Sequence, residues 1–219
     1  MPVSRSIRSG FLAAASIAAM ALAGCSTTDT FEQPAPLPEI DERVEFDRVW
    51  SMSVGDGHDG EFLHMAPLYA GDTLYAASAD GEVVAVQSEN GELIWEQDLD
   101  ERLFAGPGAD ARQLYLASRN AELIALSSED GSEQWRVSLP TEVVAAPQSN
   151  GSLVVAQTTD GRVIGFDAGN GDQLWQYDAQ VPVLTMRTGA APLVGGDVVI
   201  ASFANGRVIA LTAAAGQPV

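Results

Sequence analysis

Three tryptophans spaced forty residues apart constrain the fold of this chain more than any other feature. Trp95, Trp135 and Trp175 each end one copy of a repeated phrase, and a fourth copy starts at Asn205. The copies read DGEVVAVQSENGELIW, NAELIALSSEDGSEQW, DGRVIGFDAGNGDQLW and NGRVIALTAAAGQPV. A repeat of this length is typical of architectures in which each unit packs on the next.

Each repeat predicts four short β-strands joined by glycine-containing turns. In the third copy we expect strands at residues 145–148, 152–157, 162–166 and 173–178. Asp160-Gly161 and Asn170-Gly171 fall between these strands, and both pairs favour tight turns that need a positive φ. Helical repeats of the same length are excluded, because turns recur about every ten residues and the runs between them are rich in Val and Ile. The pattern therefore indicates an all-β fold, a β-propeller of four-stranded blades.

The recurring tryptophan has a packing explanation. Each of the first three lies four residues after a glycine, which is Gly91, Gly131 or Gly171. A large flat ring on the outer strand can cover the peptides of such a turn and join one blade to its neighbour. The alternative is that the tryptophans are simply core aromatics. The same spacing applied to Gly216 places the next tryptophan one position beyond Val219. We therefore expect an incomplete propeller, the N-terminal part of a longer one, with about four blades present.

The charge of the chain argues against one class of partner. It carries 30 acidic residues against 11 basic ones, all of them Arg, and its net charge is −19 at pH 7. A surface this acidic repels phosphate backbones, so we expect no nucleic-acid binding. The chain has one cysteine, which excludes an intrachain disulfide and a paired-cysteine metal or redox site.

That cysteine, Cys25, follows the pattern of a secretory signal. Arg5 and Arg8 precede an apolar run at residues 11–23, which is too short to span a bilayer. The small residues before Cys25 resemble the bacterial lipobox, and this resemblance implies removal of residues 1–24 and acylation of Cys25. The alternative is an ordinary signal peptide with an incidental cysteine.

The segment after the signal predicts a tether. Residues 25–43 are polar and contain three prolines, a composition typical of an extended linker. Ser26 directly after the cysteine resembles lipoproteins that are transferred to the outer membrane. We expect the partial propeller to occupy residues 44–219.

Two of the connections between blades are longer than the others. From the tryptophan to the next inner-strand proline the count is 12 for Trp95 and Trp135, but 17 for Trp50 and Trp175. Insertions in repeat proteins map to loops, often on the binding face. The two long connections are therefore candidates for an interaction site.

The second long connection is the better candidate of the two. Its sequence, DAQVPVLTMRTG, places Leu184 and Met186 beside Arg187 in a loop, where the repeat itself demands no apolar residue. Exposed aliphatic side chains beside an arginine provide what a small binding hot spot needs. We predict partner-binding residues at Leu184, Met186 and Arg187. The alternative is that the two aliphatic side chains pack beneath the loop and that Arg187 is solvated.

The sequence carries no recognisable catalytic motif. His58 and His64 lie near acidic residues, but their spacing matches no metal-ligand template. DAGNGD at residues 167–172 has glycine where a calcium loop needs ligands, so we interpret it as a turn. Most acids occupy turn positions, such as Asp80 and Asp130, where they hydrogen-bond the local backbone. We predict a non-enzymatic chain without cofactor or metal.

The repeat itself resembles a known class of propellers. The pattern A-x-x-x-x-[ND]-G-x-x-x-W over residues 80–216 resembles the docking motif of the pyrroloquinoline-quinone-type propellers. That class includes dehydrogenases that hold a quinone and Ca²⁺ in the central channel. A periplasmic quinoprotein-like dehydrogenase, or another ligand-binding propeller, is therefore the alternative function.

Local phrases narrow the resemblance further. WSMSVGDG at residues 50–57 and VPVLTMRTGAAP at residues 181–192, taken with the lipobox and tether, resemble the BamB family. These are propeller lipoproteins of the outer-membrane β-barrel assembly machinery, and the similarity covers residues 44–219. The family contact positions in the second connection fall on Leu184, Met186 and Arg187.

This resemblance implies a fold, a location and partners. It implies an eight-bladed propeller that acts as a non-catalytic scaffold, on the periplasmic face of the outer membrane. The acylated Cys25 is expected to be the sole membrane attachment. The implied partners are the barrel-inserting subunit of the machinery, contacted through its POTRA domains, and unfolded outer-membrane proteins whose insertion the scaffold aids.

Overall fold

The computed structural model describes residues 35–36, 46–57, 63–143, 145–180 and 189–219. The chain divides into two units, Met1–Phe46 and Asp47–Val219, and every described strand belongs to the second. The described residues of this second unit form strands and turns without a helix, so the expected all-β class is confirmed.

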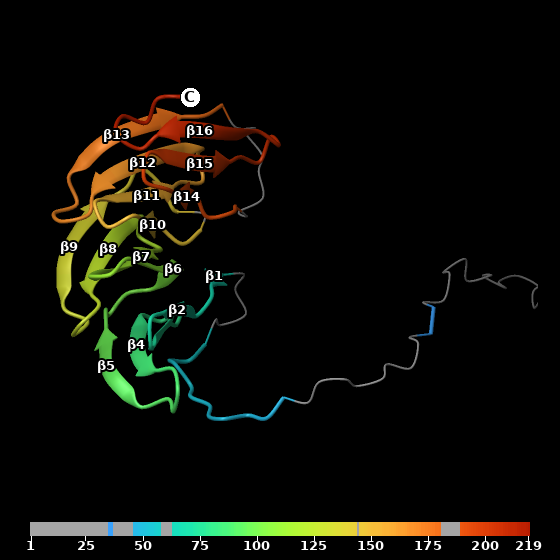
Figure 1. The fold of residues 1–219 in the computed structure, drawn as a ribbon, viewed down its shortest axis with the longest axis vertical. Coiled ribbons are helices and arrows are strands. Elements are labelled where there is room, and N and C mark those ends of the chain that lie inside the picture. The colour runs from blue at the N-terminus through green and yellow to red at the C-terminus, as the bar shows by residue number, and fades with distance from the viewer. Residues whose placement is uncertain (1–34, 37–45, 58–62, 144, 181–188) are drawn as a thin grey trace, which may run out of the picture. The chain divides into compact units, whose positions relative to one another are not determined.

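The strands form four sheets that follow one another along the chain and that we call blades 1 to 4 (Figure 1). Blade 1 contains β2 (Leu68–Ala70), β3 (Thr73–Ala77), β4 (Glu82–Gln87) and β5 (Leu93–Asp98). Blade 2 contains β6 (Leu103–Ala109), β7 (Gln113–Ser118), β8 (Glu122–Ser127) and β9 (Glu133–Ser138). Blade 3 contains β10 (Gln148–Ser149), β11 (Leu153–Gln157), β12 (Arg162–Asp167) and β13 (Gln173–Asp178). Blade 4 contains β14 (Leu193–Val194), β15 (Val198–Ser202) and β16 (Val208–Thr212).

Each blade is an antiparallel meander whose hairpin turns have the predicted backbone. Gly81, Gly161 and Gly206 adopt φ values of 111°, 86° and 80° in the turn between the second and third strands. The second repeat has Asn120-Ala121 instead, and Ala121 takes a φ of 59° without being a glycine. The turn geometry is thus kept in blade 2 although a Cβ makes it less favourable.

The inner strand of blade 3 differs from the sequence expectation. We expected it at residues 145–148, but β10 covers Gln148–Ser149 alone. Pro147 has no backbone N–H to donate to a ladder. Its carbonyl instead lies so close to Gly108 of blade 2 that a Cβ at Gly108 would collide with it. The segment before β10 therefore packs against the neighbouring blade rather than extending its own.

A further strand lies outside the repeat. β1 (His64–Met65) precedes blade 1 in the chain but pairs with β6 of blade 2, in parallel, with His64 opposite Ala105. Blade 2 is consequently a five-stranded sheet in the order β1-β6-β7-β8-β9. The sequence repeat does not predict this pairing.

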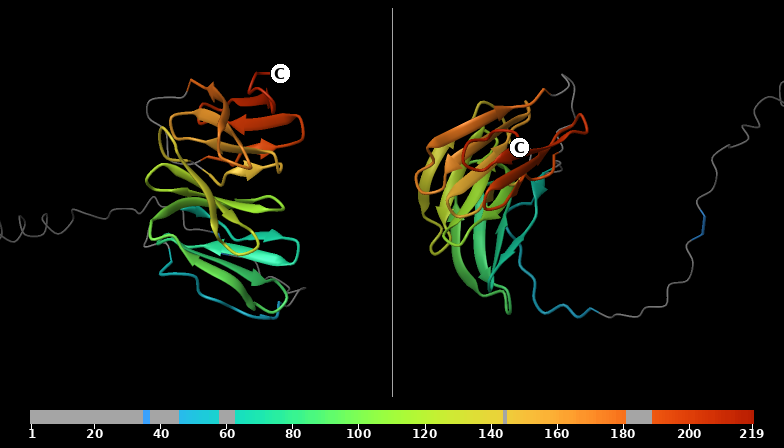
Figure 2. Two further views of the ribbon diagram at one scale, coloured as in Figure 1. Left: turned by 90° about the vertical axis from the view of Figure 1, so that its left-hand side faces the viewer. Right: turned by 45° about the horizontal axis from the view of Figure 1, so that its top comes forward.

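The tryptophans join successive blades as their spacing predicted. Each indole N–H donates to a backbone carbonyl in the turn of the next blade, at 2.7–3.0 Å: Trp50 to Ser88, Trp95 to Ser128, Trp135 to Ala168 and Trp175 to Ala213. Each ring also lies against the glycine of that turn. A Cβ added to Gly171, for example, would be 2.7 Å from the Trp135 ring. The outer strands that carry Trp95, Trp135 and Trp175 lie on the left of Figure 1, the side that faces the viewer in the left view of Figure 2.

The hydrophobic core lies between neighbouring blades rather than inside any of them. β7 shows this clearly, because its residues alternate between two clusters. Leu114 and Leu116 pack with blade 1, whereas Tyr115 and Ala117 pack with blade 3. All four are fully buried. A strand buried on both faces has no polar side to show, which explains the continuous apolar runs in the repeat.

A partly buried polar group also connects blades 2 and 3. The Asp110 carboxylate accepts hydrogen bonds from the Tyr115 hydroxyl at 2.6 Å and the Ser149 hydroxyl at 2.7 Å. It also accepts the backbone N–H groups of Arg112 and Gln113. Burial alone would raise the pKa of Asp110, but these hydrogen bonds outweigh it and hold the pKa below its ordinary value. Burial, followed by the bond to Asp110, raises the pKa of the Tyr115 hydroxyl.

A glycine substitution can measure the tryptophan docking directly. Gly171→Ala places a methyl group against the Trp135 ring, whereas Gly151→Ala meets nothing within 4 Å. Both glycines have positive φ, 76° and 90°, so each alanine costs about 1–2 kcal/mol in backbone strain. We expect Gly171→Ala to lower the free energy of unfolding in urea by about 1–3 kcal/mol more than Gly151→Ala, because of overpacking. Equal losses would show that the ring does not press on the turn.

The Asp110 carboxylate predicts a pH-dependent stability. Because its pKa is lowered in the folded state, the ionised group stabilises the fold above its unfolded pKa of about 3.9, and this contribution is lost as the pH falls through the folded pKa. We expect Asp110→Asn to reduce the free energy of unfolding by about 2 kcal/mol at pH 7. The loss should shrink at acidic pH, as the pH falls through the folded pKa and the wild-type group becomes protonated. Exposed Asp72→Asn is the control, and an equal loss for Asp110→Asn at neutral and at acidic pH would contradict the assignment.

Candidate functional site

The two ends of each blade carry different loops. At the connection end, the blade-to-blade connections run beside hairpin turns: the N–H groups of Leu99, Leu139 and Ala179 donate to the carbonyls of Gly81, Ala121 and Gly161. At the opposite turn end, two turns of one blade lie side by side: the N–H groups of Ser88, Ser128, Ala168 and Ala213 donate to the carbonyls of Asp72, Arg112, Ser152 and Asp197. Both long connections therefore belong to the connection end.

The first long connection is anchored on the hairpin turn of blade 1. The N–H of Asp56 donates to the Asp80 carboxylate at 3.1 Å, and the N–H of Ala79 donates to the Gly57 carbonyl at 3.3 Å. A hydrogen bond from Ser78, followed by the Asp56 contact, lowers the pKa of Asp80. The carboxylate is thus ionised at neutral pH and available as an acceptor. After residues 58–62, which lie outside the described part, the chain enters β1 and reaches the inner edge of blade 2.

The second long connection is anchored where it leaves blade 3. The Ala179 N–H donates to Gly161, and the side-chain amide of Asn205 in blade 4 donates to the Gln180 carbonyl at 2.8 Å. The connection ends at Pro192, which is buried before β14 begins. Both ends of this connection are thus held by blades 3 and 4. The partner-binding residues that the sequence predicts, Leu184, Met186 and Arg187, lie outside the described residues.

A cluster of charges braces the connection between blades 1 and 2. Arg136 of β9 contacts Glu101 from that connection, Glu122 of β8 at 2.9 Å and Glu133 at 2.8 Å. These hydrogen bonds, that of Glu133 above all, raise the pKa of Arg136, and Arg136 in turn lowers the pKa of Glu133. One oxygen of the buried Glu101 carboxylate has no hydrogen-bond partner. Arg136 therefore neutralises a carboxylate that would be costly to bury alone.

The sequence did not point to this cluster. Arg136 directly follows Trp135, where the other repeats carry Glu96 or Gln176. That exchange of charge at one repeat position is the signal that could have drawn attention to it. The acidic partners come from three separate strands and loops, so their convergence follows from the pairing of β8 with β9 and from the path of the connection.

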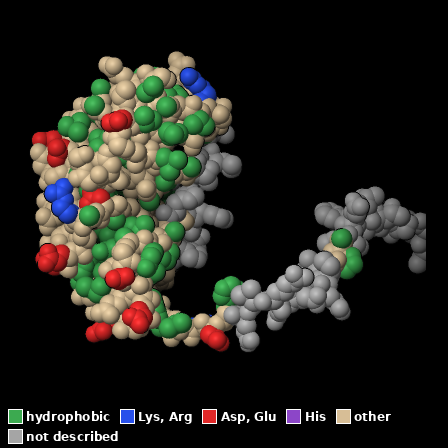
Figure 3. Space-filling model, in the orientation of Figure 1, with side chains coloured by type: hydrophobic (Ala, Val, Ile, Leu, Met, Phe, Trp, Pro, Cys, Tyr) green, Lys and Arg blue, Asp and Glu red, His purple; other side chains and the backbone are tan. Residues whose placement is uncertain are grey.

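The acidic residues at turns have the structural role expected of them. Asp130 accepts both the N–H and the hydroxyl of Ser132, and Asp160 accepts the Thr158 hydroxyl at 2.6 Å. In the DAGNGD segment, Asp167 accepts the Gly169 N–H, so the interpretation of this segment as a turn is confirmed. Figure 3 shows acidic side chains spread over the visible face with few basic ones among them.

Several other residues that the sequence analysis singled out as candidate sites lie outside the described residues. Cys25 and the tether, apart from residues 35–36, lie among residues that the structure does not describe, as do His58, Asp59 and Glu61. Among the residues that it does describe, no group of three or more His, Cys, Asp or Glu side chains is placed to hold a metal ion. In the same residues no helix is long and apolar enough to cross a membrane.

Known proteins are similar to this chain in both sequence and fold. A protein from Marinobacter adhaerens called outer membrane protein assembly factor BamB is 66% identical over 114 residues, which make up 51% of this chain and 29% of that protein. The protein of the same name from Pseudomonas aeruginosa is 41% identical over 91 residues, 41% of this chain and 24% of that protein. The match thus spans less than a third of the length of either relative.

Solved structures give the same result. The crystal structure of BamB from Moraxella catarrhalis superimposes with a TM-score of 0.66 at 31% identity, and the match covers 72% of this chain and 47% of that one. A europium-containing methanol dehydrogenase superimposes with a TM-score of 0.57 over 77% of this chain and 42% of its own, but at 18% identity it shows the fold alone. These matches confirm the expected propeller architecture.

A comparison with protein families extends the match along the whole described propeller. Residues 46–107 and 97–219 fit the family of outer membrane protein assembly factor BamB. These ranges include all four blades and the Trp50 segment that docks on blade 1. The chain therefore belongs to the BamB family.

Proposed function

We propose that this chain is a non-catalytic scaffold for the assembly of β-barrel proteins in the outer membrane. The observation that carries the proposal is the match to a family of assembly factors over all four blades. The relatives at 66% and 41% identity are both named as assembly factors. The alternative, a quinoprotein-like dehydrogenase, draws on neighbours at 15–18% identity, which share the fold alone.

The second long connection is our candidate for the docking site. Its anchors on Asn205 and Pro192 hold the two ends of a five-residue insertion between blades 3 and 4. Leu184, Met186 and Arg187 supply the apolar and charged contacts. The partner is the barrel-inserting subunit of the assembly machinery, through its POTRA domains.

The scaffold also has to be held near its partner and its clients. Acylation of Cys25 would anchor the chain at the periplasmic face of the outer membrane, because each buried methylene contributes about 0.8 kcal/mol. The polar tether then allows the propeller to reach partners in the periplasm. Unfolded outer-membrane proteins are the second class of partner, and the acidic surface disfavours nucleic acid.

The docking site can be tested by substitution in the protein expressed from its natural gene. We expect Leu184→Ala combined with Arg187→Ala to weaken capture of the barrel-inserting subunit from detergent-solubilised membranes at least about tenfold, since each hot-spot residue contributes about 2 kcal/mol. Met186→Ala should have a smaller effect in the same direction. Pull-down followed by quantitative blotting measures the capture.

A matched control removes the same residue types elsewhere. Leu93→Ala combined with Arg48→Ala alters two exposed side chains outside the second connection and should leave capture unchanged. Unchanged capture by the Leu184 and Arg187 variant would refute the docking site. A large drop in its melting temperature would instead show that these side chains are packed beneath the loop.

The lipid anchor predicts a change of location. Cys25→Ala should move the protein from the membrane fraction to the soluble periplasm, because no thioether-linked or amide-linked acyl chain can form. Ser26→Ala, which keeps the cysteine, should still incorporate labelled palmitate and stay with the membrane. Membrane retention of Cys25→Ala, with no labelling of the wild type, would rule out the anchor.

A further inference from the structure

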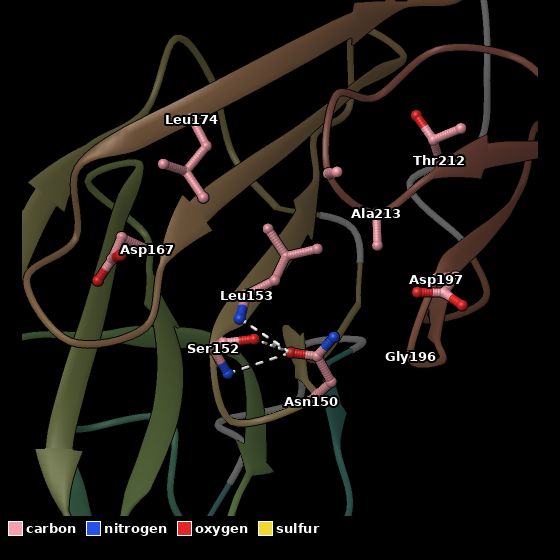
Figure 4. Close-up of a pocket in the computed structure, with 10 residues that line it drawn as sticks. Asn150, Ser152, Leu153, Asp167, Leu174, Gly196, Asp197, Thr212 and Ala213 are labelled. Carbon is pink, nitrogen blue, oxygen red and sulfur yellow. Dashed lines mark hydrogen bonds between the residues drawn. The ribbon is translucent and has the colours of Figure 1, made fainter.

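An open groove lies between blades 3 and 4 at the turn end, opposite to the connection end. It has a volume of about 570 Å³. Figure 4 shows Leu153 in the middle of the groove, with Asp167 and Asp197 on either side of it and Leu174 beside it. Leu153 is almost fully buried and forms the floor, whereas Leu174 is 54% exposed. A Cβ built on Gly196, which also lines the groove, would meet nothing within 4 Å.

The repeat allows this groove to be compared with the one between blades 2 and 3. The backbone hydrogen bonds of the turn end place Arg112, Ser152 and Asp197 at equivalent positions in blades 2, 3 and 4. Arg112 extends from blade 2 across the junction and donates to the Gly151 carbonyl of blade 3 at 2.9 Å. The groove that Arg112 lines has a volume of about 240 Å³. In blade 3 the short Ser152 stands in place of this arginine, and the space beside it is left open.

The open groove has the chemistry to accept a basic side chain from outside. Its charged lining residues are Asp167 and Asp197, and no basic residue lines it. Asp167 uses one oxygen to accept the Gly169 N–H, which leaves the other for a ligand. Leu153 and Leu174 offer an apolar surface for the aliphatic stem of arginine or for a neighbouring leucine. A guanidinium can form paired hydrogen bonds with a carboxylate that an ammonium cannot match.

The turns around the groove are also negatively charged. The turns at this end carry Asp72 and Glu89 in blade 1, Glu129 in blade 2, Asp172 in blade 3 and Asp197 in blade 4. Among the described turns of this end, Arg112 is the basic residue, and it is already bonded to Gly151. A negative rim of this kind attracts a basic ligand and raises its association rate.

We propose that the groove between blades 3 and 4 binds an extended segment of a partner protein that carries arginine next to a bulky apolar residue. The arginine takes the place that Arg112 occupies in the neighbouring junction, and its guanidinium pairs with Asp197 or Asp167. The apolar residue covers Leu153 and Leu174. This site is separate from the docking connection, because the two lie at opposite ends of the blades.

The test uses the intact protein and a capped hexapeptide of alternating leucine and arginine. Binding is followed by the chemical shifts of backbone amides in the turns of blades 3 and 4. We expect saturable binding, and at least tenfold weaker binding by the variant Asp167→Asn with Asp197→Asn. Asparagine keeps the acceptor that the Gly169 N–H needs, so the turn should survive. A peptide with glutamine in place of arginine should bind at least tenfold more weakly.

A variant that adds a larger side chain to the groove provides a second, independent test. Ser152→Arg supplies the arginine that blade 3 lacks, and we expect it to fill the groove and abolish peptide binding. The backbone N–H groups of Ser152 and Leu153, which donate to Asn150, are unaffected by this change. The control variant Asp72→Asn with Glu89→Gln removes the same charge from the rim of blade 1 and should bind the peptide like the wild type.

The possible results separate the site from its alternatives. Equal loss in the control variant would show unspecific attraction to the acidic rim and would overturn the proposal. Binding that persists in Ser152→Arg, or that is equal for the glutamine peptide, would overturn it as well, as would absence of binding at millimolar peptide. None of these results depends on the barrel-inserting subunit, so the docking connection and the groove can be confirmed or refuted independently.

Discussion

The contact between a tryptophan ring and the glycine turn of the next blade is the interaction on which the rest of this structure depends. The ring lies where a side chain at that turn would have to be, and its N–H satisfies a carbonyl that the turn leaves without a partner in its own sheet. An orphaned carbonyl in this position would cost stability, and so would an uncovered ring. One contact thus satisfies the carbonyl and covers the ring, and its repetition sets the distance between blades. The interblade clusters, the grooves at the turn end and the anchoring of connections at the other end all follow from that distance.

The sequence predicts this part of the fold well because the contact is local and periodic. The positions of Trp135 and Gly171 are visible in the repeat, and so are the turns at Gly81 and Gly161, whose positive φ the structure confirms. Outer and middle strands also fall where the pattern places them. The inner strand of blade 3 does not, because the Pro147 carbonyl packs on Gly108 of blade 2. That contact belongs to two blades, and one repeat alone does not contain it.

The candidate sites also divide into those that the sequence predicts and those that it does not. Both long connections could be predicted, since an insertion stands out against a regular period. The bracing of one short connection by Arg136 could not, because its carboxylates come from three places in the chain. The groove between blades 3 and 4 was also missed. At one repeat position it has Ser152 where the junction of blades 2 and 3 has Arg112, and this difference can be related to a groove only when the facing turn of the next blade is known.

The parallel pairing of β1 with β6 gives the first two blades a special relation. The residues between His64 and Ala105 include the whole of blade 1, so this pairing closes a loop around a complete sheet. Closing such a long loop costs more chain entropy than pairing two strands joined by a short turn. In an ordinary repeat array each unit depends on its immediate neighbours, and the ends can fray one unit at a time. If blade 1 unfolds while its leading segment remains in the sheet of blade 2, the unfolded residues form a closed loop and gain less chain entropy than a free end would. This pairing therefore couples the unfolding of blade 1 to that of blade 2.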